Sequence, residues 1–297
     1  MSLTIKNHWV QEAKELSTKK KGPGKLDGPH GIVMHYTAGW TTDGDITTLT
    51  TSDRQASVQF ILGRKGREEL YQCMPANWRA WHAGPSKYKG YNGINNYFIG
   101  IEICNAGWIK KQSNGNYVDE YGQRIDPEGR FLDYKSRYTA SMPKDWHHEY
   151  HPRLAKGDYA WEPFTVQQLD ALDELTLALI AYYPTIKHIV SHEEIDTRGW
   201  KTDPGPVFPM RRYLKLLENR GRDYDPDLLY RITADRGTVV VVYDRPSVAA
   251  IGIYTALVGQ VFWVDKKEND FYHIYGDGLP EGGWVSAQFL VPTGESK

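Results

Sequence analysis

Two apolar runs in the first third of the chain are typical of buried β-strands. Residues 31–38, GIVMHYTA, are almost wholly apolar. In residues 97–104, YFIGIEIC, isoleucines alternate with other side chains. Because successive side chains of a strand point to opposite faces, we expect Glu102 and Cys104 on the face opposite the isoleucines.

Turn residues and helix signals divide the region that follows the first strand. Residues 57–62 and 68–73 flank a glycine-containing turn, which predicts a β-hairpin. Thr165 begins a capping-box pattern, and leucines then recur at helical spacing until Pro184. The next run, residues 186–191, predicts another strand.

Composition changes along the chain indicate two domains. Residues 1–29 are polar and predict an irregular N-terminal extension. Residues 30–220 form the first predicted domain, and its stretch at about 105–160 lacks sustained periodicity, as is typical of an insertion. Residues 221–232 are polar and turn-rich, as in a linker. Residues 233–297 contain short β-runs between turns and predict a small all-β barrel.

The charge balance excludes one class of partner. The 36 basic and 37 acidic residues of the 297-residue chain nearly cancel. A nucleic-acid binder usually carries a basic surface, so we expect no nucleic-acid partner.

Cysteine content and hydropathy limit the setting. The only cysteines are Cys73 and Cys104, which rules out a disulfide framework and favours two buried thiols, with a single disulfide as the alternative. No segment approaches the ~18 apolar residues of a membrane span, and the N-terminus lacks the apolar core of a secretory signal. We therefore expect synthesis in the cytoplasm without a Sec-type signal peptide and without a membrane span.

The stretch HIVSHEEIDTRGWKTDPGPVF, residues 188–208, concentrates histidines and carboxylates. His188 and His192 are four positions apart, as in half of a zinc-binding helix motif, but the β-branched residues around them favour a strand. His192 then lies where the chain leaves the sheet, and Asp203 follows in a rigid Asp-Pro-Gly-Pro turn. With His35, these residues are candidates for a catalytic zinc site of three ligands and one open position. Taken singly, each histidine is more often structural.

Three separated blocks carry a family resemblance. They are GIVMHYTA, then RAWHAGPSKYKGYNGINNYFIGIE at residues 79–102, then HIVSH followed by KTDPGPVF. Together they resemble the zinc-dependent N-acetylmuramoyl-L-alanine amidases of the AmpD type, which are related to phage lysozyme-amidases and peptidoglycan recognition proteins. The resemblance covers about residues 30–105 and 160–215. It implies an α/β fold with a mixed central β-sheet flanked by helices.

The resemblance implies a role for each matched residue. His35, His192 and Asp203 match the three zinc ligands. Glu102 matches the acidic residue near the metal and is the expected proton acceptor. Lys201 matches the lysine before the last ligand and is expected to stabilise negative charge in the transition state. The structural alternatives are a simple Glu102–Lys201 pair and a lysine that only caps the turn.

Further residues are expected to line the substrate cleft or compete for the chemistry. His82, with Trp81 and Asn96, falls where the family lines its cleft. Cys104 shares the strand face of Glu102, so a thiol nucleophile is a lower-ranked alternative. In the second strand this chain has Val58-Gln59 where relatives often carry an aromatic residue and a histidine.

Two regions have open interpretations. The cluster WHHEYH, residues 146–151, is expected to form a solvated aromatic loop, with a lid or a second metal site as alternatives. Residues 233–292 resemble the bacterial SH3-like wall-binding barrels through VVVVYDRPS, VFWV and GGWVSAQFL. A wall-binding module and a packing module without a ligand are equally supported.

These observations predict a zinc-dependent hydrolase that cuts the amide between N-acetylmuramic acid and L-alanine in peptidoglycan or muropeptides. The alternatives are a non-catalytic peptidoglycan-recognition protein and a zinc peptidase acting on cross-links. The complete ligand set favours catalysis. The expected site of action is the cytoplasm, for recycling of wall fragments, or the cell wall after phage lysis or export by a route other than Sec. The oligomeric state is not specified by the sequence.

Overall fold

A computed structural model of the chain contains two compact units, residues 1–218 and residues 219–297. The structure describes residues 3–20, 22–26, 28–127, 131–132, 146–218, 229–235, 238–276 and 278–293. The predicted linker at 221–232 lies mostly outside the described residues, and its last part belongs to a strand of the second unit. Part of the predicted insertion, residues 128–130 and 133–145, also lies outside them.

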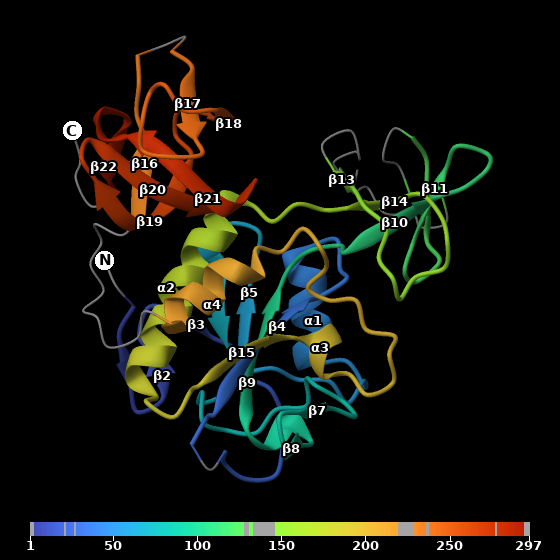
Figure 1. The fold of residues 1–297 in the computed structure, drawn as a ribbon. Coiled ribbons are helices and arrows are strands. Elements are labelled where there is room, and N and C mark those ends of the chain that lie inside the picture. Colours follow the sequence, from blue (N-terminus) through green and yellow to red (C-terminus); the bar gives the residue numbers. More distant parts are fainter. Residues whose placement is uncertain are drawn as a thin grey trace. The chain divides into compact units, whose positions relative to one another are not determined.

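A mixed β-sheet of six strands forms the centre of the first unit (Figure 1). The order is β15-β4-β9-β5-β6-β3, in which β15, β4, β9 and β5 are parallel and β6 is antiparallel to β5. The predicted mixed α/β class is therefore confirmed. The strands are β3 (Lys14–Glu15), β4 (Gly31–Tyr36), β5 (Phe60–Leu62), β6 (Leu70–Gln72), β9 (Phe98–Ile103) and β15 (His188–Ser191).

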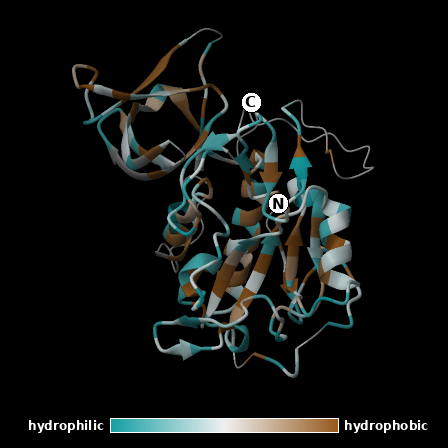
Figure 2. Ribbon diagram, turned by 90° about the vertical axis from the view of Figure 1, so that its right-hand side faces the viewer, coloured by the Kyte–Doolittle hydropathy of each residue, from teal (hydrophilic) through white to brown (hydrophobic). Residues whose placement is uncertain are grey.

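The apolar runs form the inner strands of this sheet. All six residues of β4 are buried, and much of the central sheet has the brown colour of hydrophobic residues in Figure 2. Ile99, Ile101 and Ile103 of β9 are fully buried. Cys104, on the alternate side, packs with Ile61 in a different cluster. Burial on both faces is expected for parallel strands that are covered by helices on both sides.

Helix α2 (Val166–Tyr182) confirms the prediction made from the capping box. The hydroxyl of Thr165 accepts a hydrogen bond from the backbone N–H of Gln168, and the Gln168 side chain accepts one from the N–H of Thr165. This exchange satisfies two N–H groups that the helix itself leaves unpaired. The helix ends just before Pro184, which cannot continue it.

Three other helices lie among the described residues of the first unit. Helix α4 (Met210–Glu218) packs on α2 on one side of the sheet, where the Arg212 guanidinium donates to the Asp173 carboxylate at 2.9 Å. Helix α1 (Thr42–Thr50) lies on the other side (Figures 1 and 2), and its Leu49 packs in the same cluster as Cys104. The short helix α3 (His192–Ile195) follows β15.

The N-terminal extension is not irregular throughout, which corrects the expectation for residues 1–29. Strands β1 (Ile5–Lys6) and β2 (Trp9–Val10) pair with each other, and β3 adds a parallel edge strand to β6. Val10 is buried, and its N–H donates to the Gln72 side chain at 2.8 Å. Strands of two residues are too short to show the alternation that predicts a strand.

The predicted insertion forms a small antiparallel sheet of its own (Figure 1). Its order is β12-β11-β10-β14-β13, and Ile109, Trp146 and Ala160 are buried in its core. The strands are β10 (Trp108–Lys111), β11 (Tyr117–Asp119), β12 (Arg124–Ile125), β13 (His147–His148) and β14 (Tyr159–Trp161).

In its described residues the second unit consists of β-strands and one 3-10 turn, with an antiparallel sheet of order β18-β17-β21-β20-β19-β16-β22. Its buried core includes Val240, Val242, Phe262, Ile274 and Val285. The strands are β16 (Leu229–Ile232), β17 (Val240–Tyr243), β18 (Gly252–Ala256), β19 (Val261–Glu268), β20 (Phe271–Gly276), β21 (Leu279–Ser286) and β22 (Leu290–Pro292).

The remaining elements are short. They are the paired strands β7 (Lys87–Tyr88) and β8 (Tyr91–Asn92) and the 3-10 turns Gly66–Glu69, Ile94–Asn96 and Ala287–Phe289. Cys73 and Cys104 are buried free thiols, as expected. Among the described residues, no helix has the length and apolar character needed to cross a membrane.

Candidate metal centre and active site

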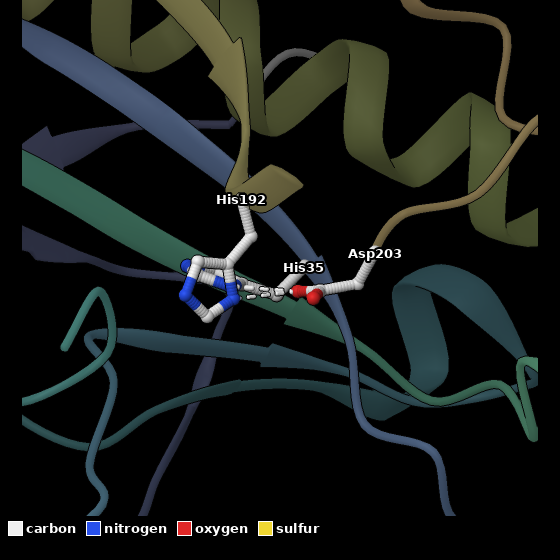
Figure 3. A group of neighbouring side chains, drawn as sticks. All are labelled: His35, His192 and Asp203. Carbon is white, nitrogen blue, oxygen red and sulfur yellow. Dashed lines mark hydrogen bonds and ion pairs between the residues drawn. The ribbon is translucent and has the colours of Figure 1, made fainter. Parts of the chain in front are cut away.

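Three side chains from separate parts of the first unit meet at one point (Figure 3). Nδ1 of His35 lies 3.0 Å from Nδ1 of His192 and 3.1 Å from Oδ2 of Asp203. Nδ1 of His192 lies 2.9 Å from the same carboxylate oxygen. The three side chains expose 1%, 4% and 5% of their residue surfaces, so the group is almost entirely buried.

Local structure brings each of the three side chains to this point. His35 is near the end of β4, and His192 begins α3 where the chain leaves the neighbouring parallel strand β15. The backbone carbonyl of Asp203 accepts a hydrogen bond from the N–H of Glu193 at 3.0 Å, which ties the loop to α3. Gly205 has φ +83°, and the Trp161 ring lies where its Cβ would be, so glycine suits this turn.

Burial and charge set the protonation of the group. Burial, and then the neighbouring His192, lowers the pKa of His35 to about 4. Burial alone would raise the pKa of Asp203, but the two histidines outweigh it and hold that pKa below its usual value. At neutral pH the group is therefore an uncharged imidazole at His35 next to a carboxylate.

The three atoms fit a zinc ion. Zinc binds histidine nitrogen and carboxylate oxygen at ~2.0–2.2 Å in tetrahedral geometry, which places neighbouring ligand atoms about 3.3 Å apart. The observed separations of 2.9–3.1 Å are close to that value. Three ligands leave one tetrahedral position for water or substrate, which is the pattern of catalytic rather than structural zinc sites.

Glu102 lies beside this group. It is paired in register with His35 on the adjacent parallel strand β9. Within the described part of the chain, its buried Oε2 has no hydrogen-bond partner. Burial, and then the charge of Asp203, raises the pKa of Glu102 well above its ordinary value. A buried carboxyl group with a free oxygen and a shifted pKa is a candidate for proton transfer.

Lys201 lies on the loop that carries Asp203. The loop is held by the Asp196 carboxylate, which accepts hydrogen bonds from the N–H groups of Trp200 and Lys201 at 3.1 and 3.2 Å. Nζ of Lys201 lies 5.8 Å from the centre of the Trp200 ring. The lysine therefore lines the cavity with Glu102 and Asp203.

A cavity of about 460 Å³ contains most of the predicted site residues. Glu102, Lys201, His192, Asp203, Trp81 and His82 all line it. Trp81 is held by Ser57, whose hydroxyl accepts its N–H at 3.0 Å. His82 is buried directly against His35, with 3.0 Å between Nδ1 of His82 and Nε2 of His35. Asn96 is not among the lining residues and lies in the 3-10 turn before β9.

The structure adds cavity residues that the sequence did not indicate. Glu120 and Tyr121 come from the turn between β11 and β12, and Arg54 faces the Tyr121 ring at 5.8 Å. The Asp119 carboxylate fixes this turn, because it accepts hydrogen bonds from the N–H of Tyr121 and from the Trp40 indole. Burial, and then the Asp203 charge, raises the pKa of Glu120 to about 7.

The two alternatives, a thiol nucleophile at Cys104 and a second metal site at residues 146–151, are less well supported. Burial, and then Asp45, raises the pKa of Cys104 well above its ordinary value, which disfavours the reactive thiolate. The histidines of the 146–151 cluster form separate pairs, of which the shortest joins His151 to Glu193 at 2.6 Å. Among the described residues, His35, His192 and Asp203 are the only group with metal-ligand spacing, so the second metal site is not seen.

On the mixed α/β sheet, a buried group of two histidines and one carboxylate lies beside a carboxylate and a lysine, which is the arrangement of a candidate metal-hydrolase site. Residues 25–206 match the N-acetylmuramoyl-L-alanine amidase family. The chain belongs to that family.

Individual relatives are about a quarter identical to the chain over the aligned residues. N-acetylmuramoyl-L-alanine amidase AmiD of Escherichia coli K12 is 26% identical over 208 residues, which are 68% of this chain and 58% of AmiD. The chain thus spans less than two thirds of AmiD. The 1,6-anhydro-N-acetylmuramyl-L-alanine amidase AmpD of Enterobacter cloacae is 26% identical over 196 residues, 66% of this chain and 74% of AmpD.

Solved structures of such amidases are similar at lower identity. A selenomethionine derivative of AmpD gives a TM-score of 0.46 at 21% identity, over 72% of this chain and 99% of AmpD. Escherichia coli AmiD in complex with anhydro-N-acetylmuramic acid-L-Ala-D-gamma-Glu-L-Lys gives 0.44 at 24% identity, over 72% of this chain and 65% of AmiD. The family assignment rests on the sequence match.

Proposed function

We propose that the protein is a zinc-dependent hydrolase that cleaves the amide between N-acetylmuramic acid and L-alanine in peptidoglycan or muropeptides. The observation that carries this proposal is the convergence of His35, His192 and Asp203 next to the unpaired carboxylate oxygen of Glu102, beside a cavity that His192, Asp203 and Glu102 line. Membership of the amidase family and the substrates named for AmiD and AmpD support the choice of bond.

In this proposal His35, His192 and Asp203 hold the metal. A zinc ion bound there supplies an acidified water molecule and polarises the carbonyl of the scissile amide. Glu102 accepts a proton from the attacking water through its free oxygen and delivers it to the leaving amine of L-alanine. Lys201 stabilises the negative charge that develops on the carbonyl oxygen.

The base needs to be ionised before it can accept a proton. Burial and then the negative charge of Asp203 raise the pKa of Glu102. When Asp203 is neutralised by a bound cation, that second contribution is lost and the pKa of Glu102 falls. We therefore expect a lower pKa at Glu102 when the metal centre is loaded than when it is empty.

The decisive experiment is digestion of purified sacculi and of a soluble muropeptide by the zinc-loaded protein, followed by mass spectrometry. The proposal expects L-alanine with a free N-terminus and N-acetylmuramic acid whose lactyl group ends in a free carboxyl group. Cleavage within the peptide cross-links would indicate a zinc peptidase instead. Binding without any new termini would indicate a recognition protein.

We also propose that the second unit is an SH3-like barrel. Its all-β sheet of short strands supports this, and a ligand in the cell wall and a purely structural role both remain compatible with it. The site of action is proposed to be either the cytoplasm, on recycled fragments, or the wall, on intact polymer.

A further inference from the structure

His82 lies between a candidate metal ligand and the backbone of β9. Its Nδ1 is 3.0 Å from Nε2 of His35, and its Nε2 is 3.1 Å from the carbonyl oxygen of Phe98. The residue is 7% exposed. Although it touches the cavity, both ring nitrogens are already paired with protein atoms, which leaves none for a substrate.

These contacts determine where the ring protons lie. The Phe98 carbonyl can only accept, so Nε2 of His82 carries a proton and donates it. With its Nε2 proton directed at Phe98, His82 offers the lone pair of its Nδ1 to Nε2 of His35, 3.0 Å away. His35 must then donate from Nε2, which leaves a lone pair on its Nδ1, the atom that faces His192 and Asp203.

His192 is oriented by Ala83, the residue that follows His82. Nε2 of His192 lies 3.3 Å from the carbonyl oxygen of Ala83, which can only accept, so Nε2 carries the proton. In a neutral ring, Nδ1 of His192 then also presents a lone pair. Two lone pairs and a carboxylate oxygen about 3 Å apart repel one another unless a cation lies among them.

The segment that holds both rings is itself fixed. The Asn95 side-chain oxygen accepts the N–H groups of His82 and Ala83 at 3.0 and 2.8 Å. Gly100 on β9 leaves room for the imidazole, because a Cβ there would lie 2.6 Å from Cγ of His82. The position of His82 is therefore set by neighbours on both sides.

We propose that His82 is a positioning residue that locks His35 in the Nε2–H tautomer and so presents its Nδ1 to the metal. This inference rests on the proposed zinc site and replaces the expectation that His82 binds substrate. Partners of this kind fix ligand orientation, and their loss commonly weakens metal binding by about 10–100-fold.

The test is zinc affinity, measured by competition with a chromophoric chelator and independent of catalysis. His82→Phe keeps a ring but removes the acceptor for His35, and we expect about 10–100-fold weaker zinc binding. His82→Asn places an amide oxygen near the former Nδ1 and should restore most of the affinity. His188→Phe is the matched control, because His188 packs against Phe98 outside the cavity, and it should bind zinc like the wild type.

The outcomes separate this inference from the proposed function. Wild-type zinc affinity in folded His82→Phe, together with a raised KM, would show that His82 contacts substrate and would overturn the proposal. Absence of zinc binding by the wild type would overturn the metal centre itself. If His82→Phe does not fold, ¹⁵N NMR of the histidine rings in the zinc-loaded wild type tests the proposal instead, because it identifies the tautomer of each ring. The Nε2–H tautomer in both His35 and His82 supports the lock, and Nδ1–H in either ring refutes it.

Discussion

His35 and Glu102 occupy paired positions on the adjacent parallel strands β4 and β9, so a candidate metal ligand and the candidate base share one face of the sheet. We predict that Glu102→Gln retains zinc but loses turnover by about 10²–10⁴-fold, because the amide keeps the size of the side chain and cannot accept the proton. Zinc content and kcat on a soluble muropeptide measure the two effects separately.

Cys104→Ala is the control for that experiment. Cys104 directly follows β9, two residues after Glu102, but its buried thiol packs with Leu49 and Ile61. We expect near wild-type turnover. An inactive Cys104 variant combined with an active Glu102 variant would instead show thiol chemistry.

The second prediction concerns the metal. Zinc-loaded protein should contain one zinc per chain by elemental analysis, because three ligand atoms converge at one point. His35→Ala and Asp203→Ala should each lose the metal and the activity, since each removes one of three ligands. Full zinc content and activity in both variants would show that the site is elsewhere.

A third prediction concerns the insertion. Glu120 lines the cavity, and its Oε2 lies 3.4 Å from the hydroxyl of Tyr36. Above its pKa of about 7, Glu120 presents a charged acceptor to the cavity. A substrate hydrogen bond to a charged group is commonly worth about 1.5 kcal/mol or more, so above pH 7 Glu120→Gln should lower kcat/KM about 10-fold with zinc content unchanged. The exposed insertion residue Glu149 provides the control, Glu149→Gln. Equal kcat/KM for both variants and the wild type would exclude a role for Glu120.

The buried carboxyl group of Asp45 predicts a pH dependence of stability. Burial is the main cause that raises its pKa from 3.8 to about 6. The folded state therefore holds a proton that the unfolded state releases, and stability falls as pH rises from about 4 through 6. Asp45→Asn lacks this loss. In zinc-free protein, raising the pH from 4 to 7.5 should therefore shift the free energy of unfolding of Asp45→Asn by about 2–3 kcal/mol in its favour relative to the wild type.

Urea unfolding of both proteins at the two pH values measures that difference. Asp43→Asn is the matched control, because Asp43 is an exposed carboxyl group on the same helix. It should follow the pH dependence of the wild type. A stability difference between Asp45→Asn and the wild type that does not change with pH would refute the assignment.

The sequence predicted elements whose signals are local. The capping box at Thr165 and the leucines after it belong to one helix, and the apolar run of β4 needs no distant partner to be recognised. Helix α1 was not predicted, because its threonines and aspartates give little helical periodicity. Its apolar packing comes from Leu49 and the partly buried Ile46.

The candidate site could not be assembled from local sequence patterns, because its residues come from different segments of the chain. His192 and Asp203 are close in sequence, but His35 is separated from them by more than half of the chain, and only the family resemblance joined them. Glu120 could not be found, because its position depends on the Trp40–Asp119 hydrogen bond between the insertion and the rest of the unit. The contact between His82 and His35 likewise depends on neighbouring strands.

The last prediction separates the two interpretations of the second unit. The candidate catalytic residues all lie in the first unit, residues 1–218, which has its own core, so a chain ending at about Arg220 should fold and bind zinc. If the second unit binds wall polymer, it raises the effective concentration at an insoluble substrate, by roughly 10²-fold or more in avidity. Truncation should then leave muropeptide cleavage near the full-length rate while sharply reducing sedimentation with sacculi and their digestion. Equal loss on both substrates would show that the second unit only supports the first, and equal retention on both would exclude wall binding.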